Sequence, residues 1–237
     1  NSYASAIADV LNKVTKDLNE TSLRISTGKR ILTAADDPAG ISMAAKLNSD
    51  NSAYGVVKKN ISSGLSLIEV SSKALETTTG LIDQMKKLAV EASSDTLSTG
   101  QRAAVQATFL ELQGQLDDVV DNATLFGKNL IGAAAASVDI QSGISAGNST
   151  TINVAQSDTA TLGIDAATID LTDVAGASAA ITALDTALTT VGTNQSILGA
   201  QQSGFNARIS NIDKLRENLE AAASRIEGAD LAEETKK

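Results

Sequence analysis

The sequence predicts a mainly α fold, an elongated antiparallel coiled-coil bundle of long helices with a small β-hairpin region at one end. A heptad pattern runs from Ile181 to Ile226 and its 3-4 spacing never slips. A helix of that length extends roughly 70 Å, so its apolar stripe needs partner helices of similar length. Aromatic residues make up only 2% of the chain, which suits thin seams of Ala, Leu, Ile and Val.

The first helix is expected from residue 1 to about residue 32. Gly28 marks its end, and Asp36 or Asp37 then provides an N-cap for a second helix that has Pro38 in its first turn. The first helix carries its own heptad seam, made of Ile7, Leu11, Val14, Leu18, Thr21 and Ile25.

The second helix is expected from about Pro38 to Ser94, with Gly55 and Gly64 weakening its first part. A turn at 93–100 follows, in which Ser98 or Thr99 is placed to cap the third helix. That helix should end at Gly127, because 3-4 spacing continues through Val105, Phe109, Leu112, Leu116, Val119, Ala123 and Phe126.

The composition changes between residues 127 and 176, where Gly, Ala, Ser, Thr and Asn dominate. Alternating runs at 137–140 and 151–154 flank Gly147-Asn148, which predicts a hairpin or a short strand cluster. The last helix is expected to return antiparallel to the third. We therefore divide the chain into N-terminal rod helices (1–126), a small β-rich cap or reduced variable region (127–176) and a C-terminal rod helix (177–237).

Composition also bounds the chemistry. The chain has no His and no Cys, which excludes Ser-His-Asp and Cys-His catalysis, zinc-finger sites and disulfides. We expect no enzyme, catalytic residue, cofactor or metal. The net charge of −9 argues against a nucleic-acid partner, and no apolar run approaches the ~20 residues of a membrane span.

Three stretches carry a family resemblance. They read LRISTGKRI followed by ADDPAG at 23–40, LAVE at 88–91 and SRIEGAD at 224–230. Together, in this order and separation, they resemble bacterial flagellin, the subunit of the flagellar filament. The resemblance implies a filament rod domain that self-assembles for swimming motility. This chain is then expected to be a core fragment without the terminal helices that drive polymerisation.

The resemblance also implies a location and partners. The protein would be extracellular, in the flagellum, and exported without a cleaved signal peptide. Its partners would be other copies of itself, a flagellar export chaperone and the filament cap. Neighbouring subunits would meet at a loop that includes five residues: Arg24, Arg30, Asp36, Asp37 and Pro38.

A second surface follows from the same family. Many flagellins are bound by Toll-like receptor 5 on a helix whose matching stretch here is 83–91. Leu88 fits the pattern, but the key Arg is replaced by Gln84, a following Glu by Lys87, and a Glu on the next helix by Thr108. Losing a forked donor and reversing a charge removes specific contacts, so we expect weak receptor activation.

Two other functions stay open. A hook-filament junction protein would share the rod pattern. A cell-surface adhesin could bind an anionic polysaccharide, because residues 1–60 carry eight basic and six acidic residues, including Lys58-Lys59.

Overall fold

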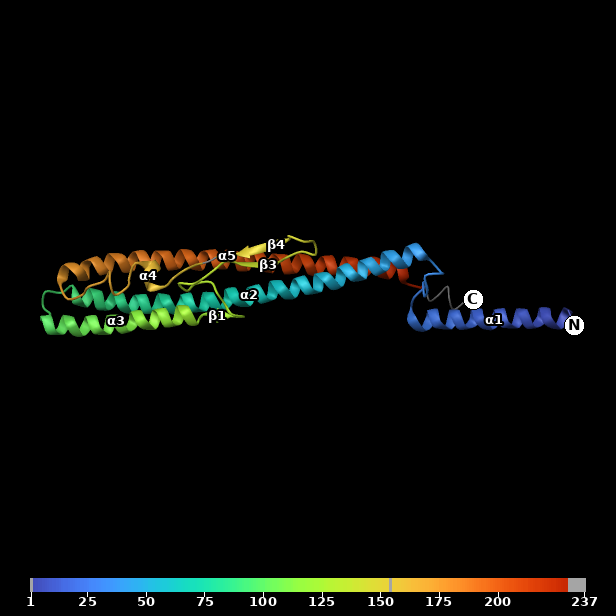
Figure 1. Ribbon diagram of the computed structural model, residues 1–237, viewed down its shortest axis with the longest axis horizontal. Coiled ribbons are helices and arrows are strands. Elements are labelled where there is room, and N and C mark those ends of the chain that lie inside the picture. Colours follow the sequence, from blue (N-terminus) through green and yellow to red (C-terminus); the bar gives the residue numbers. More distant parts are fainter. Residues whose placement is uncertain (1, 154, 230–237) are drawn as a thin grey trace. The chain divides into compact units, whose positions relative to one another are not determined.

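The computed structural model describes residues 2–153 and 155–229, and it is mainly α, as the sequence predicts (Figure 1). In this part of the chain three helices are followed by two small strand pairs and then by two more helices. The helices are α1 (Ser2–Thr27), α2 (Pro38–Ala92), α3 (Thr99–Asn122), α4 (Thr159–Leu162) and α5 (Val174–Glu227). The strands are β1 (Thr124–Leu125), β2 (Lys128–Asn129), β3 (Val138–Gln141) and β4 (Ser149–Ile152).

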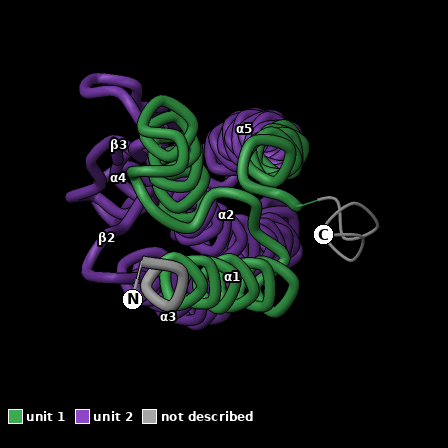
Figure 2. Tube along the Cα trace, turned by 90° about the vertical axis from the view of Figure 1, so that its right-hand side faces the viewer, with its two compact units in different colours: residues 1–56, 211–237 green, residues 57–210 purple. Residues whose placement is uncertain are grey.

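The chain divides into two compact units (Figure 2). Unit 1 comprises residues 1–56 and 211–237, and unit 2 comprises residues 57–210. Each long helix α2 and α5 therefore contributes to both units, and the units are described separately below.

Unit 2 is a helical bundle in which α2 and α5 run antiparallel. Lys86 pairs with Asp185, and Gln195 Nε2 donates to Thr79 Oγ1 at 3.5 Å. The residue numbers rise on one helix as they fall on the other. Because a short turn joins α2 to α3, α3 runs in the same direction as α5 (Figure 1). The expectation that the last helix is antiparallel to the third was wrong, since its antiparallel partner is α2.

The heptad seam of α5 is confirmed. Every seam position is buried or half-buried, and the two classes alternate from Ile181 to Ile212. The buried set is Leu184, Val191, Leu198, Phe205, Ile212 and Ala223. The larger apolar side chains of α2 and α3 that are fully buried in unit 2 are Ile61, Ile68, Leu75, Ile82, Met85, Phe109, Leu116 and Val120. This small-residue and branched-aliphatic seam forms the core without needing many aromatic rings.

The turn between α2 and α3 is closed by side chains. Ser98 is the N-cap of α3, and its hydroxyl accepts from Gln101 N while Gln101 Oε1 accepts from Ser98 N at 2.8 Å. Arg102 donates to the carbonyls of Ala92 and Ser94 at 3.0 and 2.7 Å, which satisfies the open end of α2. The predicted cap is thus confirmed at Ser98.

Helix α3 ends earlier than the heptad spacing predicts. It stops at Asn122, and Phe126 and Gly127 form a two-residue turn between β1 and β2. Asn129 explains the stop, because its Nδ2 donates to Val120 O at 2.8 Å and to Asp121 O at 3.1 Å, while its Oδ1 accepts from two following amides. The 3-4 spacing of Phe126 was coincidental.

The predicted hairpin around Gly147 is confirmed. β3 pairs antiparallel with β4, with Val138 opposite Ile152 and Gln141 opposite Ser149. This hairpin packs on α2 at Gly64, where an added Cβ would lie 3.1 Å from Ile140 Cγ1. The glycine that weakens the helix pattern is therefore the place where a hairpin approaches its backbone.

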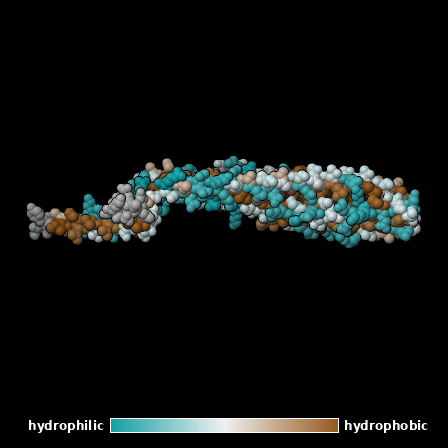
Figure 3. All heavy atoms as spheres, turned by 180° about the vertical axis from the view of Figure 1, so that it is seen from behind, coloured by the Kyte–Doolittle hydropathy of each residue, from teal (hydrophilic) through white to brown (hydrophobic). Residues whose placement is uncertain are grey.

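Helix α1, in unit 1, leaves its seam uncovered. Ile7, Leu11 and Leu18 are 63%, 64% and 68% exposed, and Val10, Val14 and Ile25 are also exposed. In the space-filling view apolar side chains gather over this helix (Figure 3). A stripe with heptad spacing but no partner among the described residues is the main departure from the expected bundle.

One helix has the length and composition of a membrane span. An 18-residue window of α5 reaches a mean hydropathy of 1.3, and 28% of that window is buried. A single such helix is weak evidence, because the apolar seam of a bundle helix passes the same test.

Candidate assembly surface

The loop after α1 is tied to the end of α5. Gly28 adopts a positive φ of 67°, which ends the helix, and the chain then pairs with residues 227–229. Arg30 N donates to Glu227 O at 2.6 Å, and Ala229 N donates to Gly28 O at 3.0 Å. Lys29 Nζ lies 2.7 Å from Glu227 Oε2, so an ion pair reinforces the backbone bridge.

Asp36 organises the tip of this loop. Its Oδ2 accepts from the amides of Leu32 and Thr33 at 3.0 and 2.8 Å, and Arg24 Nη2 lies 3.6 Å from its Oδ1. The pKa of Asp36 is lowered, first by the Thr33 amide, then by the Leu32 amide, with a smaller contribution from Arg24. The carboxylate thus stays ionised and holds the turn.

Asp37 and Pro38 start α2, as the sequence predicts. Asp37 Oδ1 accepts from Gly40 N at 2.9 Å, and Pro38 is the first helical residue, where no amide is needed. Gly40 fits tightly, since an added Cβ would lie 2.8 Å from Ile31 Cδ1. Ile31 is buried at 4% exposure, so the loop is anchored by an apolar contact as well as by caps.

The structure brings four of the five predicted contact residues into defined interactions within unit 1. Arg24 meets Asp36, Asp37 caps α2 through Gly40, and Arg30 Nη2 donates to Ile226 O at 3.3 Å. Pro38 begins the helix. These interactions are internal, so they fix the shape of the loop that any neighbouring chain would meet.

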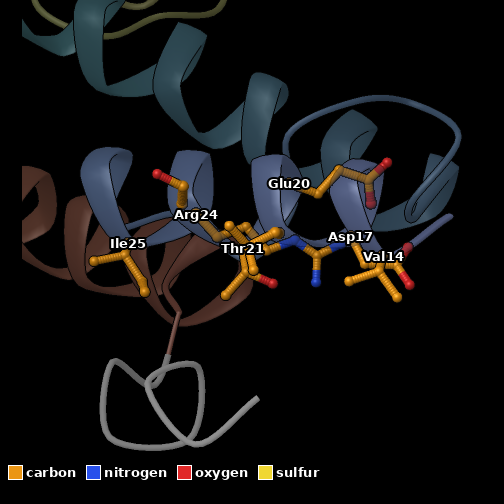
Figure 4. A pocket seen from close by; sticks show the side chains of 8 residues that line it. Val14, Asp17, Glu20, Thr21, Arg24 and Ile25 are labelled. Atoms are coloured by element: carbon orange, nitrogen blue, oxygen red, sulfur yellow. The ribbon is translucent and has the colours of Figure 1, made fainter. Parts of the chain in front are cut away.

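A shallow groove runs along α1 beside this loop. It is lined by Val14, Asp17, Leu18, Glu20, Thr21, Ser22, Arg24 and Ile25, all from one helix (Figure 4). Its walls combine exposed aliphatic groups with charges of both signs. Exposed apolar groups rimmed by charges are typical of surfaces that contact other protein chains.

The predicted receptor-facing residues lie on two helices of unit 2. Gln84 and Lys87 are exposed on α2, Leu88 is half-buried beside them, and Thr108 is exposed on α3. The Thr108 hydroxyl donates to Ala104 O at 3.2 Å within its own helix. Among the described residues, no hydrogen bond or ion pair joins Thr108 to the other three.

A second groove, which the sequence did not predict, lies on the same stretch of α2. Asp83, Lys86, Lys87 and Val90 line it, and Val90 is 52% exposed. The lysine stems and the valine give it apolar walls, whereas the charged ends stand at its rim.

Sequence reasoning also missed a polar pair in unit 1. Arg216 occupies a heptad seam position on α5, and its Nε donates to Asn51 Oδ1 of α2 at 2.9 Å. The guanidinium lies beside Gly55, 3.7 Å from the position of an added Cβ, which is an ordinary van der Waals distance. An arginine in an apolar seam is the signal that would have indicated a polar partner on the facing helix.

The described part of the chain contains no group of three or more His, Cys, Asp or Glu side chains placed to hold a metal ion.

The comparisons with known proteins point to one family. Residues 1–136 match the bacterial flagellin N-terminal helical region, and residues 181–237 match the bacterial flagellin C-terminal helical region. A flagellin of Halalkalibacterium halodurans is 30% identical over 211 residues, which cover 89% of this chain and 78% of that protein. Flagellin A of Vibrio anguillarum is 28% identical over 137 residues, or 58% of this chain and 36% of that protein.

Solved structures share the fold. The crystal structure of Bacillus cereus flagellin superposes with a TM-score of 0.57 at 22% identity, covering 65% of this chain and 88% of that one. A putative flagellar hook-associated protein from Vibrio parahaemolyticus gives a TM-score of 0.67 at 10% identity, covering 81% and 100%. The chain spans little more than a third of the Vibrio flagellins that it matches. With family models matching both its N-terminal and C-terminal helices, the chain belongs to the bacterial flagellin family.

Proposed function

We propose that this chain is a structural subunit of the flagellar filament and forms a helical polymer outside the cell. Family membership supports this function, and one structural observation carries it furthest: the exposed apolar seam of α1. A stripe with heptad spacing gains free energy only when another helix covers it. A filament subunit has a use for such a stripe, because assembly supplies the cover.

The loop at 28–37 has a positioning role in this proposal. Arg24, Arg30, Asp36, Asp37 and Pro38 hold the loop against α5 and start α2, so the loop presents a fixed surface to a neighbour. Contacts between different surfaces of identical subunits build an open polymer rather than a closed ring. The rod helices at 1–126 and 177–237 would form the assembly core, and the cap at 127–176 would face outward.

Sedimentation of the full-length protein tests this function. We expect long polymers from the unaltered protein, and loss of polymers from Leu11→Asp/Leu18→Asp, which places charges on the exposed seam. The matched control is Ile197→Asp, an exposed apolar residue (38%) on α5. If the unaltered protein forms no polymers, or the seam variant polymerises normally, the proposal fails.

Export without a cleaved signal peptide belongs to the same proposal, as do two partners, an export chaperone and the filament cap. N-terminal sequencing of protein sheared from cells tests it. We expect the N-terminus encoded by the gene, with at most the initiator Met removed. A cleaved leader would contradict this route.

The hook-filament junction is the second candidate. The fold likeness to a putative hook-associated protein supports it at the level of architecture alone. Immunogold labelling separates the two functions, since a filament subunit labels the whole filament and a junction protein labels only its base. An adhesin would instead bind anionic polysaccharide in a salt-dependent titration.

We also propose that the receptor-facing surface is degenerate. Gln84 and Lys87 are exposed, so they would meet a receptor directly. Cells that bear Toll-like receptor 5 should respond weakly to the full-length protein, and Gln84→Arg/Lys87→Glu/Thr108→Glu should raise the response. A response to the unaltered protein equal to that of an enteric flagellin would overturn this.

A further inference from the structure

Phe126 stands out as a strained, exposed aromatic residue. Its φ is 53°, and Gly127 beside it has a φ of 69°, so the turn between β1 and β2 has two successive positive values. Such turns favour Asn-Gly, because a bulky side chain in this region is strained. Yet the ring is 75% exposed, whereas Phe109 and Phe205 are 0% and 2% exposed. Folding alone gives no reason for a Phe here.

The groove on α2 is a surface that an exposed aromatic ring could cover. Asp83, Lys86, Lys87 and Val90 line it, and the two lysine stems and the valine form its walls. An aromatic ring placed on these walls would cover the apolar surface of the lysine stems and the valine. Among the aromatic side chains that the structure describes, Phe126 is the one with a largely exposed ring.

The charges around the two features are complementary. Lys128 follows the Phe126 turn and is exposed, and Asp121 is exposed at the base of the same hairpin. Asp83 and Lys87, one helical turn apart, both line the groove. A copy that docks its turn in the groove can therefore pair Lys128 with Asp83 and Asp121 with Lys87.

We propose that the Phe126 turn of one subunit docks in the α2 groove (Asp83, Lys86, Lys87, Val90) of a second copy. The inference rests on the proposed filament function and names a contact within it. The turn and the groove cannot meet within one chain. They lie at opposite ends of the α2–α3 hairpin, separated along its axis by roughly 30 Å of helix. The contact is thus heterologous and staggered, and each copy offers both halves, which propagates an open polymer.

Disulfide cross-linking tests the contact, because residues 1–237 contain no cysteine that would compete with the introduced pair. Lys128→Cys and Asp83→Cys keep Phe126 and the groove walls in place. Filaments of the double variant should give a ladder of multimers on oxidation. A mixture of the two single variants should give dimers, and either single variant alone should give none. The control pair, Lys128→Cys with Glu220→Cys, should not cross-link.

A second measurement separates assembly from folding. Phe126→Asn should leave the melting temperature unchanged or higher, since Asn tolerates the positive φ. The same change should raise the critical concentration for polymerisation about tenfold, the scale of losing one anchoring aromatic. Ile144→Asn, at an exposed apolar residue of the other hairpin, should change neither.

The outcomes are distinct. Filaments that form normally but give no ladder, or a critical concentration unaffected by Phe126→Asn, overturn this contact and leave the filament function standing. If the unaltered full-length protein forms no filaments, the proposed function fails and the contact fails with it.

Discussion

Arg216 of α5 donates from Nε to Asn51 of α2, reaching Oδ1 at 2.9 Å and the backbone oxygen at 3.3 Å. The contact places a polar layer within an apolar heptad seam of unit 1. Polar residues at single seam positions specify the register of neighbouring helices at some cost in stability. The pair therefore sets which residues of α2 and α5 face one another.

Replacing one partner should cost more than replacing both. Asn51→Ala leaves the half-buried guanidinium without its Oδ1 acceptor, and we expect a loss of about 1–3 kcal/mol in the free energy of unfolding. Asn51→Leu/Arg216→Leu should recover most of that loss through apolar packing, while allowing other registers. Denaturant unfolding measures the first effect, and distances between spin labels on α2 and α5 measure the second. Equal losses for the single and double variants would contradict the assignment.

Gly40 should not tolerate a methyl group. An added Cβ would lie 2.5 Å from Asp37 Oδ2 and 2.8 Å from Ile31 Cδ1, so Gly40→Ala must displace the N-cap or the loop anchor. We expect a loss of about 1–2 kcal/mol. The control is Gly80→Ala in the same helix, where nothing lies within 4 Å, and the better helix former should add about 1 kcal/mol. Thermal unfolding by circular dichroism should show opposite signs for the two variants.

The loop at 28–37 should weaken in acid. The Thr33 and Leu32 amides lower the pKa of Asp36 below its ordinary value of 3.8. A carboxyl with a lowered folded pKa stabilises the folded state fully above the ordinary value, and that stability is lost as the pH falls through the lower folded pKa. Protection of the Thr33 amide from hydrogen exchange, corrected for its intrinsic rate, should therefore drop below about pH 4. Asp36→Asn should remove this pH dependence; an unchanged profile would point to another group.

The capping box at the start of α3 can be tested with two neighbouring alanine variants, one at the cap and one at the residue after it. Ser98→Ala removes the hydroxyl that accepts from Gln101 N, and should destabilise unit 2 by about 1 kcal/mol. Thr99→Ala, at the first helical residue, should change the free energy of unfolding by only a few tenths of a kcal/mol. Urea unfolding of the two variants decides between Ser98 and Thr99 as the cap, and a larger effect at Thr99 would reverse the assignment.

The four long helices could be predicted because each is marked by local chemistry, whereas the one-turn helix α4 lies in the segment expected to be a β-rich cap and was not predicted. Ser98, Asp37 and Gly28 begin or end helices through their own backbone preferences, and the seam of α5 repeats often enough to be unmistakable. The end of α3 could not be predicted in this way. Phe126 continues the spacing by chance, and the stop depends on Asn129, which bonds back to a carbonyl nine residues earlier.

The candidate surfaces depend on contacts that sequence spacing does not show. The residues Arg24, Asp36 and Asp37 were identified from their resemblance to the flagellin motif. Their partners within the chain are visible only in the folded structure. Lys29 and Glu227 each lie in one of the family motifs, but they are 198 residues apart in the chain and nothing in the sequence pairs them. The exposure of the α1 seam could not be predicted either. A heptad pattern indicates that an apolar stripe needs a partner helix, but it does not indicate whether the same chain provides that helix.

Helix α1 has the mechanics of a lever arm. The hydrogen bonds and ion pairs described above that join it to the rest of unit 1 all lie at Arg24 or later, close to the positive-φ residue Gly28. From Gly28 to Ile7 the helix extends roughly 30 Å. A rotation of about 10° at the Gly28 pivot would thus displace Ile7 by about 5 Å, close to one helical turn. A small change in the pairing between residues 28–30 and 227–229 would therefore shift the exposed seam of α1 by about one turn against a partner helix.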